Sequence, residues 1–204
     1  MSRFRYDQER GLYLPRERRI EPGLHSSCGP AFFASSSAVW RTVFSLGTQG
    51  NSSTGWSGYT IRTVIGSSYL GGSATKLRLT FRGSGGGSVT TKCYVQEAAA
   101  SGDVYDYSGT PVQVLFSGAA NFASIAAGVE LVSDEVTISL SGTKNLVYGH
   151  LSGAAAWGSA FPAADVVPIA SSWYRLGDEA ATVDATTGYT PNSAYPVVKL
   201  EVFG

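Results

Sequence analysis

The chain contains two histidines among its 204 residues, and these limit the acid–base chemistry that it can perform. A serine, threonine or cysteine nucleophile needs a base within hydrogen-bonding distance, most often a histidine. His25 lies in a stretch interrupted by proline and glycine, and His150 lies at the expected end of a strand. Neither belongs to a nucleophile motif. We therefore interpret both as packed or solvated side chains and predict no catalytic residue.

The acidic residues are too dispersed to predict a metal site. Asp103 and Asp106 share one loop, and Asp178, Glu179 and Asp184 share another. A hard cation such as Ca²⁺ takes about six to eight oxygen ligands, so two or three carboxylates in one loop are better interpreted as solvated. Two histidines and two cysteines at unrelated spacings form no zinc motif. We predict no metal and no cofactor.

The two cysteines are too few for a disulfide framework. Cys93 has the same parity as Val95 in a strand-like run, which predicts a buried free thiol. Cys28 lies in a loop-like stretch and could cross-link subunits in an oxidising medium. Whether either cysteine forms a disulfide is left open.

Aromatic side chains in or beside loops give a better indication of function. Aromatic residues make up 12% of the chain. A flat ring with a polar tip can stack on a sugar or fill a pocket of a neighbouring subunit. Packing in the core or against a subunit is the alternative for every ring. The candidate glycan-contacting residues are Trp56, Tyr105, Tyr107, Trp173 and Tyr174.

Charged residues make up only 15% of the sequence, and the formal net charge is zero. This balance does not favour nucleic acid or an anionic membrane as a partner. No apolar run reaches about 18 residues, so no transmembrane helix is predicted. The basic N-terminus is followed by no apolar segment, which predicts no secretory signal. We therefore expect synthesis in the cytoplasm.

Residues 1–37 differ in composition from the rest and are predicted to form an extended, irregular N-terminal arm. The first twenty residues contain six arginines against three acids, a balance of +3, with −3 in the remainder. The arm is too apolar for a solvated tail, so we expect it to become ordered on another subunit. A tail that is disordered or folded on its own domain is the alternative, and interleaved acids make nucleic acid a poor partner. The predicted partner-binding residues are Arg3, Phe4, Arg5, Tyr6, Arg10, Tyr13, Arg16, Arg18 and Arg19.

Residues 38–204 are patterned as short β-strands separated by turns. In residues 76–82, Leu77, Leu79 and Phe81 alternate with polar residues, and a strand sorts these onto opposite faces. Roughly nine or ten such strands, with turn signals at about ten-residue intervals, predict an all-β domain. We expect an antiparallel two-sheet sandwich, jelly-roll-like, rather than a closed barrel. The last strand, Val197 to Phe203, is expected to pair inside a sheet.

The stretch from Pro111 to Leu140 shows the period-two pattern twice. Two such runs close together predict a pair of half-buried antiparallel strands joined through a turn at Ala127-Gly128. The side chains expected to face inward are Val112, Val114, Phe116, Val136, Ile138 and Leu140.

Three segments between Thr75 and Leu151 carry a family resemblance: TKLRLTFRGSGGGSVTTKCYV, TPVQVLFSGAANFASIAAGVELVSDEV and NLVYGHL. They resemble the β-sandwich module beside the catalytic domain of some SGNH/GDSL-type hydrolases, and similar modules occur in tail, fibre and spike proteins of tailed bacteriophages. Those hydrolases need a Gly-Asp-Ser block and a later Asp-x-x-His. Here Asp103 precedes Val104, Asp178 precedes Glu179, and no Asp-x-x-His occurs. The resemblance therefore implies a non-catalytic module.

Together these observations predict a non-enzymatic structural virion protein of a tailed phage or phage-like particle. We expect a decoration, spike or fibre component of the head, neck or tail that is anchored through its arm. Its expected partners are other virion proteins and further copies of itself in a homo-oligomer, with a trimer as the expected order. It could contribute to host adhesion by binding a surface glycan. The alternative is a carbohydrate-binding module derived from an SGNH-type esterase.

Overall fold

The computed structural model describes residues 4–7, 12–15, 37–46, 51–54, 57–83, 89–118, 123–126, 128–153, 156–158, 170–192 and 196–204. Contacts between Cα atoms divide the chain into two units, residues 1–36 and residues 37–204. In the first unit, β1 (Phe4–Asp7) and β2 (Leu12–Pro15) pair antiparallel. The segment predicted to be irregular thus contains one short strand pair.

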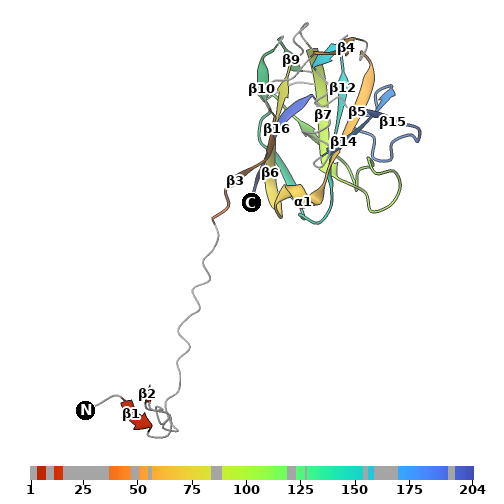
Figure 1. Cartoon of the computed structure of the whole chain (residues 1–204). Coiled ribbons are helices and arrows are strands. Elements are labelled where there is room, and N and C mark those ends of the chain that lie inside the picture. Colours follow the sequence, from red (N-terminus) through yellow and green to blue (C-terminus); the bar gives the residue numbers. More distant parts are fainter. Residues whose placement is uncertain are drawn as a thin grey trace. The chain divides into compact units, whose positions relative to one another are not determined.

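The second unit is an all-β sandwich of two antiparallel sheets (Figure 1). The strands of the five-stranded sheet are β3 (Trp40–Ser45), β6 (Ala74–Arg82), β10 (Glu130–Val132), β11 (Val136–Leu140) and β16 (Val197–Phe203). Their order is β10–β6–β16–β3, and β11 also pairs with β6. The last strand lies between β6 and β3, so the prediction that it pairs inside a sheet is confirmed.

The strands of the seven-stranded sheet are β5 (Tyr59–Ile65), β7 (Val89–Glu97), β8 (Val112–Val114), β9 (Ala123–Ile125), β12 (Leu146–Ser152), β14 (Ala170–Leu176) and β15 (Thr190–Asn192). Their order is β15–β14–β5–β12–β7–β8, and β9 also pairs with β7. A further two-stranded sheet joins β4 (Asn51–Thr54) to β13 (Ala156–Gly158). The one helix in the described residues is α1 (Ser67–Leu70), and none of these residues forms a helix long and apolar enough to cross a membrane.

Eight of these strands have the connectivity of a jelly roll. In chain order they are β3, β5, β6, β7, β8, β11, β12 and β16. Numbered one to eight, they lie in the order 1-8-3-6 in one sheet and 2-7-4-5 in the other. This is the double Greek key of an eight-stranded jelly roll, which confirms the predicted fold. Strands β14 and β15 are inserted between the seventh and eighth strands and extend the second sheet beyond β5.

Burial of side chains in the core between the two sheets confirms the period-two alternation predicted for β6 and β11. On β6, Leu77, Leu79 and Phe81 are completely buried. On β11, alternate residues are buried and exposed along the whole strand. Burying one face of a strand against the opposite sheet produces this alternation. Thr80, which was expected on the outer face of β6, is also buried.

One predicted pairing is wrong. The strands around Val114 and Ile138 do not pair, because β8 pairs with β7 in the seven-stranded sheet and β11 pairs with β6 in the five-stranded sheet. Both runs face the same core from opposite sides, which is why they share the same period. The backbone crosses from one sheet to the other between β9 and β10. Ser133 lies between β10 and β11, which both pair with β6. Its hydroxyl accepts the Leu79 N–H of β6 at 3.0 Å and so links the chain to β6 where the strand pairing is interrupted.

Candidate functional site

Two long loops cover the outer face of the seven-stranded sheet. Residues 99–110 lie between β7 and β8, and residues 177–189 lie between β14 and β15. We call these two segments the loop platform. They explain why β5 and β12 are buried on both faces, whereas a sheet with one solvated face would show alternation. A second, smaller hydrophobic cluster lies between platform and sheet and includes Val64, Tyr105, Tyr107, Val147 and Tyr189.

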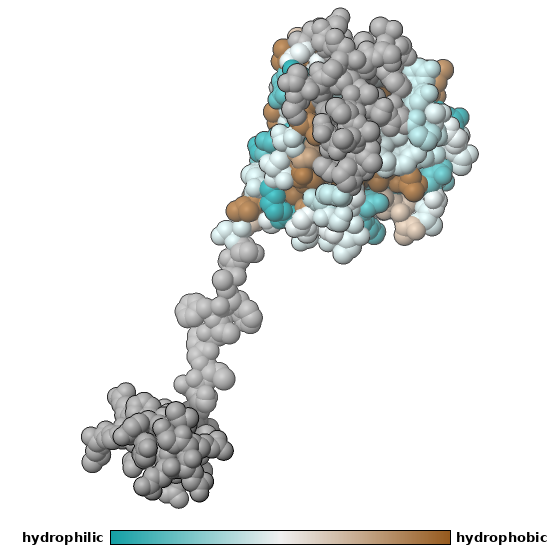
Figure 2. Space-filling model, in the orientation of Figure 1, coloured by the Kyte–Doolittle hydropathy of each residue, from teal (hydrophilic) through white to brown (hydrophobic). Residues whose placement is uncertain are grey.

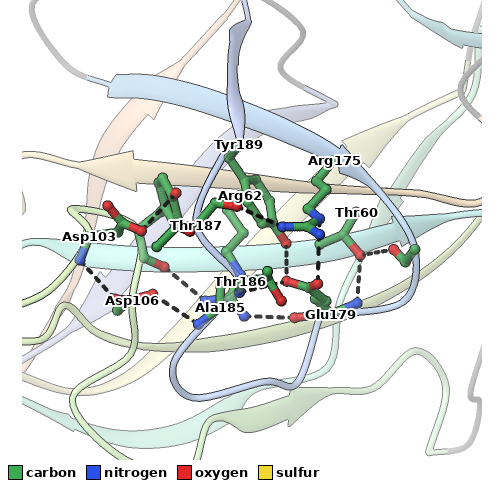
Figure 3. Close-up of polar contacts among 12 residues, drawn as sticks. Thr60, Arg62, Asp103, Asp106, Arg175, Glu179, Ala185, Thr186, Thr187 and Tyr189 are labelled. Atoms are coloured by element: carbon green, nitrogen blue, oxygen red, sulfur yellow. Dashed lines mark hydrogen bonds and ion pairs between the residues drawn. The ribbon is translucent and has the colours of Figure 1, made fainter.

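Arg62, in the middle of β5, holds both loops against the sheet (Figure 3). Its side chain is completely buried. The guanidinium donates to the backbone carbonyls of Tyr105 at 2.8 Å and Glu179 at 2.6 Å, and also to that of Thr182. It also stacks over the Tyr107 ring, 4.3 Å from the centroid. A guanidinium presents five N–H donors in one plane, so a single side chain can bind carbonyls from two separate loops.

Asp106 joins the two loops to each other. One carboxylate oxygen accepts the Ala185 N–H from the second loop at 3.0 Å. The other accepts the Asp103 N–H within its own loop at 2.8 Å. The side chain of Asp106 is buried, and both of its oxygens are engaged by backbone donors. Its role is therefore to fix the loop conformation.

Glu179 fixes the conformation of the second loop. Its carboxylate accepts the Thr186 N–H at 3.0 Å and the Tyr189 hydroxyl at 3.3 Å, and it lies 3.7 Å from Nε of Arg175. At the start of the loop, the Thr60 hydroxyl accepts the Glu179 N–H at 2.9 Å. Burial is the main cause that raises the pKa of Tyr189, so this phenol stays protonated and donates.

Tyr107 needs a glycine opposite it on β12. Its hydroxyl donates to the Ala180 carbonyl at 3.0 Å. A Cβ atom on Gly149 would lie 2.4 Å from that hydroxyl oxygen and 3.0 Å from the Ala180 carbonyl oxygen. Glycine therefore lets the Tyr107 side chain and the second loop approach the sheet. Burial raises the pKa of Tyr107 well above its ordinary value.

The four predicted glycan-contacting residues that the structure describes do not form one surface. Tyr105 and Tyr107 are only 5% and 2% exposed, so the expectation that these loop rings face solvent is wrong. The physical reason is that their loop folds back onto Arg62 and closes the second cluster. Trp173 is half-buried against Tyr105, with ring centroids 5.7 Å apart. Tyr174, the next residue on β14, packs on the opposite face against the main core.

Trp56 lies outside the described residues, so its part in a glycan site stays a prediction. The same holds for Arg3, Arg10, Arg16, Arg18 and Arg19 of the arm. Phe4, Arg5 and Tyr6 lie on β1 and Tyr13 lies on β2. Binding of a partner by these residues stays a prediction.

His150 and Cys93, the histidine and the cysteine that fall within the described residues, are both buried in the sandwich. His150 lies inside β12 rather than at its end and is completely buried, with its ring 6.1 Å from that of Phe81. Burial lowers the pKa of His150 to about 3. Cys93 pairs with His150 across the strands and is a buried free thiol, as predicted. Burial raises the pKa of this thiol, which disfavours the nucleophilic thiolate. His25 and Cys28 lie outside the described residues.

The acidic loops were predicted to be solvated, but two of their carboxylates are structural. Within the described part of the chain, no group of three or more His, Cys, Asp or Glu side chains is arranged to hold a metal ion. Sequence reasoning missed Arg62 as the centre of the site. One signal could have found it, namely a single arginine in the otherwise apolar and threonine-rich strand YTIRTVI.

The chain matches no established protein family and no curated protein. The fold is therefore established by the strand connectivity alone, and the resemblance to the modules beside SGNH-type hydrolases stays a prediction.

Proposed function

We propose that this protein is a non-enzymatic structural component of a tailed-phage-like virion. In this proposal, the N-terminal residues bind a neighbouring virion protein, and the sandwich is the head domain. The observation that carries the proposal is the division of the chain into an arginine-rich unit, residues 1–36, and a jelly-roll unit, residues 37–204. Eight-stranded jelly rolls serve as viral capsid and lectin domains, an analogy at the level of the fold.

The chemistry of the loop platform supports a scaffold rather than a reaction centre. A catalytic site keeps polar groups ready for a substrate and shifts their pKa values towards the working pH. Here Arg62, Asp106 and Glu179 are occupied by backbone groups of the loops. His150 is enclosed by the core, and its lowered pKa makes it a weak base.

Carbohydrate binding is the second candidate function, and Trp173 is the residue that favours it. This ring is partly exposed on the outer face of the seven-stranded sheet, beside Tyr105. Half-exposed aromatic rings held by a rigid sheet suit stacking on a sugar. A glycan array with the full chain and Trp173→Ala tests it. Binding that the substitution removes would support a lectin role, and a blank array with the full chain would eliminate it.

Limited trypsin digestion tests the structural role. The first twenty residues contain six arginines, which are trypsin sites. We expect rapid cleavage there in the dilute isolated chain at 500 mM NaCl and protection in purified particles that contain the protein. Particles dissociated before digestion serve as the control and should regain sensitivity. Equal cleavage rates in particle-bound and isolated protein would contradict the proposal.

A further inference from the structure

The loop platform carries acidic residues without basic ones. Its two segments contain Asp103, Asp106, Asp178, Glu179 and Asp184 but no lysine or arginine. Asp106 and Glu179 are turned inward to backbone donors, and Asp103 is half-buried and accepts the Tyr105 hydroxyl at 3.0 Å, whereas Asp178 and Asp184 are exposed. Asp178 pairs with Lys92 on β7, and among the described residues no hydrogen bond or ion pair engages the Asp184 carboxylate. Arg175 on β14 likewise pairs with Glu179, so within the described part of the chain the negative charge left without an ion pair at this surface is that of Asp103 and Asp184, and it favours a partner of the opposite sign.

Exposed apolar side chains lie on the same two loops. Val104 is 57% exposed on the first loop and Val183 is 40% exposed on the second. The two loops are joined at Val183, because the Tyr107 N–H donates to the Val183 carbonyl at 3.0 Å. On the face drawn in Figure 2, the hydrophobic residues form scattered patches among polar ones. Acidic and apolar groups together are typical of a surface that binds a cationic, apolar segment.

The chain itself contains such a segment. Residues 1–20 hold six arginines together with Phe4, Tyr6, Leu12, Tyr13 and Leu14. We propose that the loop platform binds residues 1–20 of a second copy of this chain. This inference rests on the proposed function, in which the arm binds a neighbour, and it specifies the neighbour as an identical subunit and the contact as the platform.

A contact between the arm of one copy and the platform of the next joins two different surfaces. Such a heterologous contact produces a reciprocal two-fold dimer, a larger closed ring or an open filament, depending on the rotation that relates the two copies. A ring built in this way is compatible with the expected trimer. Because the contact is electrostatic and lies at the surface, it weakens as salt rises.

Sedimentation velocity of the full chain tests the proposal. At 50 mM NaCl we expect a mass above that of the 21.4 kDa monomer that increases with protein concentration, and at 500 mM NaCl a shift towards the monomer. Asp103→Asn combined with Asp184→Asn should weaken association about tenfold, since two rim charge contacts are lost. The matched control combines Glu130→Gln with Glu135→Gln, which removes two exposed acids from the five-stranded sheet and should leave association unchanged.

Reversing the charges of the platform and of the arm distinguishes a direct contact between them from a general effect of net charge. Asp184→Lys should strongly weaken association, as should Arg3→Glu with Arg5→Glu; Asp184 is chosen because it is exposed, whereas Asp103 also accepts the Tyr105 hydroxyl. Mixing these two variants should restore complexes with an even number of subunits, in which a reversed arm meets a reversed platform and an unmodified arm meets an unmodified platform. A three-membered ring cannot alternate the two variants. Circular dichroism spectra matching the unmodified chain show that each variant is folded.

Two results would overturn the inference in different ways. If the arm variants dissociate the oligomer but the platform variants behave like the unmodified chain, the arm binds a neighbour elsewhere. The proposed function then survives and this contact does not. A full chain that remains monomeric at every concentration and salt rules out a second copy as the partner, and the trypsin experiment then decides the proposed function independently.

Discussion

Replacing Arg62 by methionine should detach the loop platform from the sheet. The substitution keeps much of the buried aliphatic volume but removes a guanidinium that donates to three loop carbonyls. A hydrogen bond to a charged group contributes about 1.5–3 kcal/mol net, and a buried carbonyl left unpaired costs about 1–3 kcal/mol. The loops can relieve part of that cost by opening to water. We therefore expect the free energy of unfolding to fall by about 3–5 kcal/mol, the range for breaking a buried charged network.

Urea denaturation measures this loss, and hydrogen exchange locates it. Amides of residues 99–110 and 177–189 should exchange faster in Arg62→Met, whereas those of β6 and β16 should be little changed. Arg62→Lys should lie between the two proteins, because one ammonium cannot span carbonyls from two loops as a planar guanidinium does.

Arg78→Met is the matched control. Arg78 lies on the outer face of the five-stranded sheet, over the Trp40 ring and 3.3 Å from the Glu201 carboxylate, and its side chain is 31% exposed. A partly exposed ion pair contributes at most about 1 kcal/mol, so its replacement should have a small effect. A loss below about 1 kcal/mol in Arg62→Met, with unchanged exchange in both loops, would refute the role assigned to Arg62.

Three further outcomes follow from the same geometry. Gly149→Ala should lower the free energy of unfolding by about 1–3 kcal/mol, because the new methyl group overlaps the Tyr107 hydroxyl; urea denaturation checks this, and an unchanged midpoint would contradict it. The pKa of His150 is lowered to about 3 in the folded protein, so the unfolded chain gains a proton first. The contribution of neutral His150 to the free energy of unfolding is complete above pH 6.5. It decreases by about 1.4 kcal/mol per pH unit as pH falls from 6.5 towards 3. His150→Gln should remove this share of the acid sensitivity, and identical pH profiles of stability in the two proteins would disprove the assignment. Cys93 should react with a thiol reagent only on unfolding; in a Cys28→Ser background, rapid labelling of the native protein would contradict its burial.

The sequence pattern predicted the strands better than it predicted their partners. Alternation at Leu77, Leu79 and Phe81 was visible because β6 buries one face and presents charged residues on the other. Alternation around Val114 and Ile138 was equally clear, but period two says only which residues share a face. It does not say whether two strands pair or oppose each other across a core, and here they oppose.

The buried loop aromatics could not be predicted from local sequence. Tyr105 and Tyr107 lie among glycine, serine and aspartate, a composition typical of a solvated loop. Their burial depends on Arg62, about forty residues earlier, and on a second loop more than seventy residues later. Contacts at that separation arise from topology, which period and composition do not encode.

The proposed function requires that residues 1–36 bind a neighbouring subunit in a particle. Hydrogen–deuterium exchange of the isolated chain and of purified particles containing it tests this claim most directly. We predict that backbone amides of residues 1–36 exchange rapidly in the isolated chain at 500 mM NaCl, where we expect a monomer, and are protected in the particle, with the core strands of residues 37–204 protected in both. Equally rapid exchange of residues 1–36 in both samples would contradict it.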